Sequence, residues 1–439
     1  MNGINVNERN GTPISMHSNS ALEADSGSDG HRPERHERAL QTRMVHAGED
    51  RSQPVRPLTE PIFQSSVYAF DEPPIFAHPS GAAAPQPMYS REHFPNVAAL
   101  EVAIAELEGA EAGYAVASGM AAISHVFMTL LSQGDHVIVA EGSYCDTELL
   151  MHRVLGRFGI ETSVVSRCDH IAMERAITDR TRVVFVETIA NPSINVCDIV
   201  GLSGICHRRG VRLVVDNTFA TPALCRPIEH GADLVIHSAT KFLGGHHDLT
   251  AGIIVGRADL IAEIRPTGYL LGALLGALDA WLALRGVRTL APRMAWISAS
   301  AQRVAQFLAR HPAIRHVSYP GLATGSDADL VKTLLPNGAG GMILIQLKGG
   351  VAATEAAIRR LELIQFAPSL GGTVSTVCYP PVGRMGVYDP QLSNGQLRLS
   401  VGLEAVDDII RDLDHALAGL PVDHDDSHVH RADMEHTSS

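Results

Sequence analysis

Residues 233–246 read DLVIHSATKFLGGH. The first half is a β-branched apolar run that predicts a buried strand at 233–237. Directly after it come Ser238, Thr240 and Lys241, and then a glycine pair that favours a turn. In open α/β sheets, ligands lie beyond the carboxyl ends of the strands. The segment therefore predicts a strand that delivers two hydroxyls and one lysine to a ligand site.

Four other short apolar runs have the composition of strands, and segments with helical periodicity separate them. These runs lie at 113–117, 136–140, 182–187 and 212–216. Ser118 follows the first run, and Glu187 and Asp216 end the last two. Short strands alternating with helices predict an α/β protein with a mostly parallel sheet, whose strand ends bring these polar residues together.

The pattern changes after residue 288, which predicts a second, smaller α+β domain. A chain of 439 residues exceeds the size of a single core, so two domains are expected on length as well. The expected elements of the second domain are a helical stretch through residue 310, strands at 342–347 and 396–400, and a helix at 406–417. We expect the leucine-rich run 270–290 to form a long helix that joins the domains.

Composition excludes several classes of protein. The formal net charge of −13 repels nucleic acids and anionic membrane surfaces, and no apolar run is long enough to cross a bilayer. The six cysteines form no pairs typical of zinc sites or disulfide frameworks, so no metal is expected. The first 50 residues lack the apolar segment of an export signal, which favours the cytoplasm. Residues 1–38 and 422–439 have the composition of a disordered leader and tail.

Lys241 and Asp216 are candidate cofactor residues. A lysine amine can form a Schiff base with an aldehyde, and a partly desolvated site favours its nucleophilic form. A carboxylate at a strand end can pair with a protonated pyridine nitrogen. The alternatives are a surface lysine in a flexible turn and an aspartate that caps the next turn.

Ser118-Gly119-Met120 follows a strand and opens a predicted helix. The first N–H groups of a helix bind anions, and glycine permits close approach. Packing alone can also produce a strand, glycine and helix in this order. Together with Lys241 and Asp216, the segment matches the phosphate, the aldehyde and the ring nitrogen of pyridoxal 5′-phosphate (PLP).

At this point the sequence resembles the Cys/Met-metabolism, or transsulfuration, family of fold-type I PLP enzymes, which includes cystathionine γ-synthase and methionine γ-lyase. The resemblance runs from about residue 42 to residue 417. Seven stretches carry it in order: Tyr89-Ser90-Arg91, Ser118-Gly119-Met120-Ala121-Ala122, Glu187-Thr188 with Asn191-Pro192, Asp216-Asn217-Thr218-Phe219-Ala220-Thr221-Pro222, Ser238-Ala239-Thr240-Lys241, Ser369-Leu370-Gly371-Gly372 and Arg398-Leu399-Ser400-Val401-Gly402.

The resemblance implies a large PLP-binding domain at 91–287, a C-terminal domain at 288–421 and an N-terminal arm at 39–90 that contacts a neighbouring subunit of a homotetramer. Lys241 would carry the cofactor and shuttle protons, Asp216 would pair with its ring nitrogen, and Tyr144 would stack on the ring and assist the leaving group. The residues implied for the phosphate are Gly119, Met120, Ser238 and Thr240, with Tyr89 and Arg91 of the neighbouring subunit. Those implied for the substrate carboxylate are Arg398, Ser369 and Asn191.

The sequence departs from the family pattern around the substrate. Cys145-Asp146 follows Tyr144 where a glycine-containing pair is usual, and Val374 stands near the position of a common glutamate. A buried ammonium needs a countercharge, so the loss of that glutamate disfavours cystathionine and favours a smaller or apolar γ-substituent, as in specialised metabolism. Cys145 either tunes the leaving-group site or is a small buried hydrophobe.

The expected activity is γ-elimination or γ-replacement on a γ-substituted L-amino acid, through a vinylglycine-type intermediate. One alternative is β-elimination, as in cystathionine β-lyase, which would use nearly the same residues. Another is a binding or regulatory protein of the same fold without catalysis. The sequence leaves the leaving group and any second substrate open.

Overall fold

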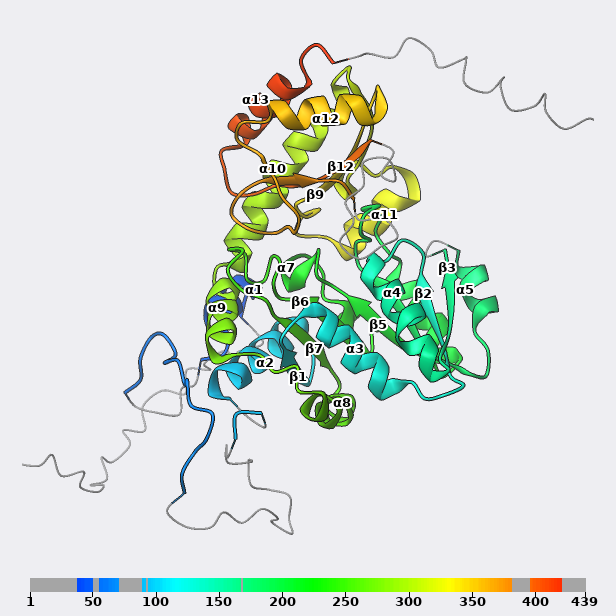
Figure 1. Cartoon of the computed structure of the whole chain (residues 1–439), viewed down its shortest axis with the longest axis vertical. Coiled ribbons are helices and arrows are strands. Elements are labelled where there is room, and N and C mark those ends of the chain that lie inside the picture. The colour runs from blue at the N-terminus through cyan, green and yellow to red at the C-terminus, as the bar shows by residue number, and fades with distance from the viewer. Residues whose placement is uncertain are drawn as a thin grey trace, which may run out of the picture. The chain divides into compact units, whose positions relative to one another are not determined.

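Two β-sheets organise the part of the chain that the computed structural model describes (Figure 1), which comprises residues 38–49, 55–70, 89–91, 94–166, 169–380 and 395–420. The segments expected to be a disordered leader and tail, at 1–38 and 422–439, lie outside these residues apart from Arg38. The arm expected at 39–90 is described only in part.

The larger sheet has the strand order β1-β7-β6-β5-β4-β2-β3 within the described residues. Its strands are β1 (Ala112–Val116), β2 (His136–Ala140), β3 (Glu161–Val165), β4 (Thr181–Glu187), β5 (Arg212–Asp216), β6 (Leu234–Ser238) and β7 (Gly252–Gly256). β7 runs antiparallel to β1 and β6, whereas the pairs among β2 to β6 are parallel. The predicted mostly parallel sheet is confirmed, and the carboxyl ends of β4, β5 and β6 share one edge.

Helices cover both faces of this sheet. α2 (Pro95–Glu108) and α9 (Ala277–Val287) contact each other, and so do α3 (Gly119–Leu130) and α8 (Ala258–Leu271). Side chains alternate between the faces of a strand. Val214 of β5 accordingly shares a core with Phe127 of α3, whereas Leu213 and Val215 share another with Leu100 of α2. The remaining helices are α1 (Leu40–Val45), α4 (Cys145–Arg153), η2 (Leu155–Phe158), α5 (His170–Ala176), α6 (Ile199–Arg208), α7 (Thr221–Leu224) and η3 (Pro227–His230).

The second sheet has the order β10-β11-β12-β9-β8 and a hydrophobic core of its own, with Leu308, Ile343 and Leu399 fully buried. Its strands are β8 (Ile314–Ser318), β9 (Met342–Leu347), β10 (Gln365–Phe366), β11 (Thr376–Cys378) and β12 (Gln396–Ser400). The helices of this part are α10 (Leu290–Arg310), η4 (Pro320–Leu322), α11 (Gly325–Leu334), α12 (Gly350–Arg360) and α13 (Val406–Leu417).

The long joining helix expected at 270–290 is wrong. α8 ends at Leu271, and Gly272 follows in the left-handed conformation with φ of 75°. This is the usual way in which a glycine terminates a helix. α9 begins after Gly276 and ends at Val287, before α10 starts at Leu290.

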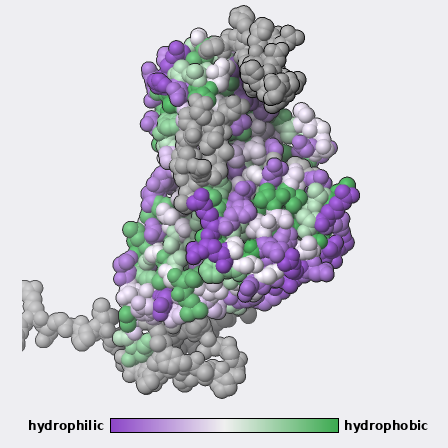
Figure 2. Space-filling view, turned by 45° about the vertical axis from the view of Figure 1, so that its right-hand side comes forward, coloured by the Kyte–Doolittle hydropathy of each residue, from purple (hydrophilic) through white to green (hydrophobic). Residues whose placement is uncertain are grey.

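The surface in the view of Figure 2 intersperses hydrophilic and hydrophobic residues. Within the described residues, no helix has the length and apolar composition needed to cross a membrane. Several large apolar side chains are nevertheless exposed in the N-terminal segment and before α9, and those with the clearest exposure are Val55, Leu58, Val67 and Leu270.

Candidate active site

Lys241 lies in the turn after β6, where its Nζ donates a hydrogen bond to Ser369 Oγ at 2.9 Å. Burial, and next the positive charge of Arg398, lower the pKa of Lys241 from 10.5 to about 8. A larger fraction of the amine is therefore neutral at physiological pH than in an exposed lysine. Because the neutral amine is the nucleophile, Lys241 is suited to attack an aldehyde.

Asp216 ends β5, next to β6, and its Oδ1 accepts a hydrogen bond from the Thr218 N–H at 2.9 Å. Burial raises the pKa of Asp216, and its hydrogen bonds with Thr218 oppose that effect. Within the described residues, no lysine or arginine is among the groups whose charge acts on this carboxylate. A cationic ring nitrogen would supply the missing countercharge.

The start of α3 lies against β6. Ser118 caps the helix by accepting a hydrogen bond from the Ala121 N–H at 3.1 Å. A Cβ on Gly119 would lie 2.7 Å from the Cβ of Ser238, so only glycine fits. The first N–H groups of a helix have no intrahelical partner and attract anions. The Ser238 hydroxyl and this helix terminus therefore lie side by side, where they could hold a phosphate.

Arg398 lies on β12 of the second sheet and is only 4% exposed. Its guanidinium donates to Asn191 Oδ1 at 3.0 Å and to the Ser369 carbonyl at 3.2 Å. Its Nε is buried and has no hydrogen-bond partner within the described part of the chain. A buried, oriented guanidinium with a spare donor is suited to bind a carboxylate.

Tyr144 directly precedes α4, and its hydroxyl donates to Asp146 Oδ2 at 2.7 Å. Burial, followed by the charge of Asp146, raises the pKa of the adjacent Cys145 thiol to about 11. Cys145 is therefore a neutral thiol at physiological pH, which argues against a nucleophilic role. Asp146 is a polar neighbour of Tyr144 whose role the sequence left open.

Glu187, at the end of β4, is a site residue that the sequence analysis did not assign. Its Oε1 accepts from the Tyr144 N–H at 2.7 Å, and its Oε2 accepts from the Asn191 N–H at 2.8 Å. One buried carboxylate thus fixes the segments that carry both residues. The sequence feature that could have identified Glu187 is its position as a charged residue at the end of an apolar strand.

One pocket collects most of the candidate site residues. Its lining includes Gly119, Met120, Tyr144, Asn191, Asp216, Ser238, Thr240, Lys241, Ser369 and Arg398. The two candidates that do not line it are Tyr89 and Arg91. The Arg91 guanidinium instead lies over the ring of Tyr269, with 4.2 Å between its carbon and the ring centroid. Within the described residues, no cluster of histidine, cysteine, aspartate and glutamate could hold a metal ion.

Pyridoxal phosphate has an aldehyde, a basic ring nitrogen and a phosphate, which match Lys241, Asp216 and the start of α3. The position of this pocket at the carboxyl edge of a mostly parallel sheet, beside a second sheet, defines a fold-type I PLP enzyme. The chain belongs to the family of Cys/Met metabolism PLP-dependent enzymes, whose model matches residues 41–418.

Individual relatives agree with this assignment. L-methionine gamma-lyase of Pseudomonas putida is 40% identical, over 86% of this chain and 96% of the relative. Cystathionine beta-lyase MetC of Bacillus subtilis is 41% identical, over 75% of this chain and 85% of the relative. The crystal structure of metB from Corynebacterium glutamicum has a TM-score of 0.81 at 31% identity and covers 88% of this chain and all of that one. The predicted fold, family and cofactor are confirmed.

Proposed function

We propose that the protein catalyses γ-elimination or γ-replacement on a γ-substituted L-amino acid. The observation that carries this proposal is the distance of 2.9 Å between the Lys241 amine and Ser369, whose carbonyl oxygen also accepts from Arg398. A substrate whose α-carboxylate binds Arg398 would therefore hold its Cα near the amine. The similarity to methionine gamma-lyase supports the same reaction class.

The cofactor, when bound, would join the substrate amino group and withdraw electrons from Cα. Lys241 would hold it before the reaction and then move protons at Cα and Cβ of the substrate. Asp216 would pair with the ring nitrogen, and Gly119, Met120, Ser238 and Thr240 would hold the phosphate. Arg398, Asn191 and Ser369 would fix the substrate carboxylate.

Tyr144 would stack on the cofactor ring and act on the γ-substituent. The Tyr144 hydroxyl donates its hydrogen bond to the carboxylate of Asp146. Position 374 holds a valine, so it supplies no countercharge for a distal ammonium. We therefore expect a γ-substituent other than that of cystathionine.

The proposed assembly is a homotetramer in which residues 39–90 reach a neighbouring subunit, and Tyr89 and Arg91 complete its phosphate site. The described part of this arm is anchored by a hydrogen bond of 2.8 Å from Trp281 Nε1 to the Glu60 carbonyl. It exposes Leu58, which a partner subunit would cover. We assign the cofactor to a domain at 91–287 and the substrate carboxylate to one at 288–421.

The proposed compartment is the cytoplasm. Five cysteines among the described residues are free thiols, which fits a reducing environment.

A substrate panel tests the reaction. Purified holoenzyme is incubated with L-methionine, cystathionine, an O-acyl-L-homoserine and a γ-halo amino acid, each with and without a thiol. Release of 2-oxo acid and ammonia indicates elimination, whereas a new thioether amino acid indicates replacement. Comparable turnover of cystathionine and the smaller substrates would contradict the proposed selectivity.

β-Elimination is the second candidate, because the similar protein from Bacillus subtilis is a cystathionine beta-lyase. S-alkyl-cysteines added to the panel distinguish the two reactions. Pyruvate from these substrates, without 2-oxobutyrate from the γ-substituted ones, would favour β-elimination.

A further inference from the structure

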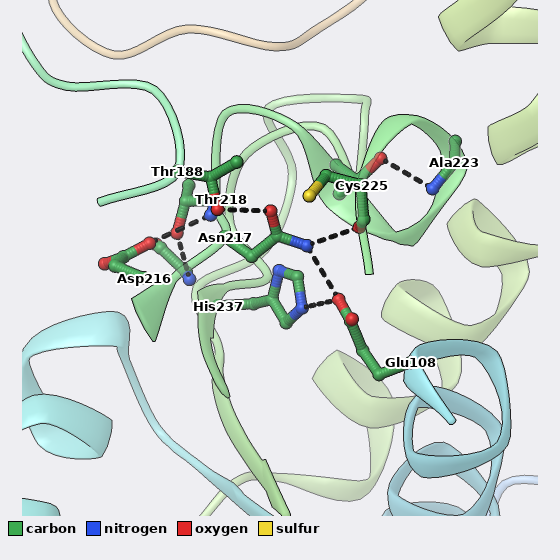
Figure 3. A network of polar contacts seen from close by, with 10 residues as sticks. Glu108, Thr188, Asp216, Asn217, Thr218, Ala223, Cys225 and His237 are labelled. Carbon is green, nitrogen blue, oxygen red and sulfur yellow. Dashed lines mark hydrogen bonds and ion pairs between the residues drawn. The ribbon is translucent and has the colours of Figure 1, made fainter. Parts of the chain in front are cut away.

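A buried acidic network lies behind Asp216 (Figure 3). Glu108, the last residue of α2, is fully buried, and its Oε1 accepts a hydrogen bond of 2.8 Å from Asn217 Nδ2. The same oxygen lies 2.7 Å from Nε2 of His237, which is also fully buried. Neither residue lines the pocket, so the proposed reaction leaves them without a role.

Both partners of Glu108 are chain neighbours of cofactor residues. Asn217 follows Asp216 directly, and His237 directly precedes Ser238. Asn217 Oδ1 also accepts a hydrogen bond of 2.8 Å from the Thr188 hydroxyl, next to the end of β4. The network therefore holds together the ends of β4, β5 and β6.

The unpaired atoms of the network indicate how its protons are distributed. His237 Nδ1 and Glu108 Oε2 are buried and have no hydrogen-bond partner among the residues that the structure describes. A neutral ring that donates from Nε2 leaves a bare acceptor at Nδ1, whereas an imidazolium would leave an N–H unpaired, and buried orphan N–H groups are rarer. Glu108 Oε1 is thus the shared acceptor for Asn217 and His237, as suits a carboxylate oxygen.

Other charges around the network are few. Asp216 faces it from β5, and protonation of His237 would lower the pKa of Asp216, which shows that the two are within electrostatic reach. The charges of Glu108 and Glu229 act on the buried Cys225, and each raises the pKa of that thiol, whereas Arg226 lowers it. Glu108 is thus one of two carboxylates whose charge acts on the buried residues behind the end of β5.

We propose that Glu108 is a positioning residue for the cofactor: it holds Asp216 and Ser238 in place through Asn217 and His237, and its negative charge favours a protonated ring nitrogen at Asp216. Charges interact more strongly in a protein interior than in water, so a buried carboxylate behind Asp216 stabilises a cation in front of it. The proposal rests on the proposed function, because it requires pyridoxal phosphate in the pocket.

The test compares two cofactors on one variant. The dissociation constants of pyridoxal phosphate and of its carbocyclic analogue, in which CH replaces the ring nitrogen, are measured by absorbance titration of cofactor-free wild type and Glu108→Gln. We expect Glu108→Gln to weaken binding of pyridoxal phosphate about tenfold and binding of the analogue less than about threefold. Equal losses for both would overturn the electrostatic role and leave a purely structural one.

His136→Gln is the matched control. His136 is a buried histidine whose ring nitrogens lie 2.8 Å from Thr181 Oγ1 and 2.9 Å from Ser163 Oγ, at the start of β2 and away from the site. It should change neither affinity by more than about twofold, since it carries no charge toward the cofactor.

If Glu108→Gln does not fold, His237→Gln still decides the question. A glutamine at position 237 can donate to Glu108, and the charge of Glu108 is unchanged. The variant should therefore still prefer pyridoxal phosphate over the analogue. Loss of that preference would overturn the proposal. A wild type that binds neither cofactor would instead contradict the proposed function.

Discussion

Lys241 provides a test in the cofactor-free protein. With its pKa lowered to about 8, its neutral fraction grows as the pH rises through about 8 and then saturates. The rate at which the protein captures pyridoxal phosphate, followed by visible absorbance, should therefore reach a plateau near pH 9 to 10. Arg398→Gln should move the midpoint to higher pH, because the charge of Arg398 lowers this pKa. A wild-type midpoint near 10.5 would contradict the assignment.

Asp146 provides a test of the leaving-group side. Asp146→Ala removes the acceptor of the Tyr144 hydroxyl, so we expect turnover to fall about tenfold while the cofactor stays bound. The same change removes a charge that raises the pKa of Cys145, so alkylation of that thiol at pH 9 should become faster. Glu148→Ala, two residues further along α4, is the control and should leave turnover within about twofold of wild type.

Individual site residues differ in how far the sequence reveals them. Lys241 and Asp216 could be predicted because each directly follows or ends an apolar strand beside other polar residues. The hydrogen bonds of Glu187 and Glu108 could not be predicted, because their partners are distant in the sequence. Tyr144 lies 43 positions from Glu187. His237 lies 129 positions from Glu108. Such contacts depend on how strands are ordered in the sheet, which a single sequence does not encode locally.

At the scale of elements, the loop at 369–372 is packed closely against the lysine turn. Gly371 has φ of 79°, and a Cβ there would lie 2.6 Å from the Phe242 nitrogen. Gly371→Ala should therefore lower stability by about 3 kcal/mol and weaken cofactor binding, because either the loop or Lys241 must move. The measurement is the midpoint of thermal unfolding together with a cofactor titration.

Gly272→Ala is the matched control for that substitution. Gly272 has φ of 75°, and nothing lies within 4 Å of a Cβ built on it. Gly272→Ala should lower the free energy of unfolding by only about 1 kcal/mol, because an alanine is strained in the left-handed conformation. Cofactor affinity should be unchanged. Similar effects of the two substitutions would show that the contact with Phe242 is unimportant.

Prediction of the elements succeeded where the strands are buried. The predicted strands at 136–140 and 212–216 coincide with β2 and β5. β3 was not predicted, because it lies at the edge of the sheet and its residues are largely polar and incompletely buried. β7 was not predicted either, because its apolar run is short and has a glycine at each end. The helix expected at 270–290 failed because Gly272 terminates α8 and α9 begins only after Gly276.

At the scale of the whole molecule, the proposed sharing of sites between subunits predicts complementation. Lys241→Ala and Tyr89→Phe are each expected to be nearly inactive. Unfolding and refolding the two together should restore about a quarter of wild-type activity, since half of the dimers are mixed and each has one intact site. A mixture as inactive as its components would show that Tyr89 serves its own subunit.

The core of the smaller sheet has a consequence for laboratory recombination. Asp216 ends a strand of the larger sheet and Lys241 lies in the turn after the next strand, whereas Arg398 lies on the smaller sheet, which has a core of its own. Chimeras that exchange the C-terminal part with that of a relative should therefore alter substrate choice and retain cofactor capture. The contact between the exchanged part and the lysine turn tolerates little variation. In a chimera with any residue other than glycine at position 371, the Cβ of that residue would clash with the backbone of Phe242.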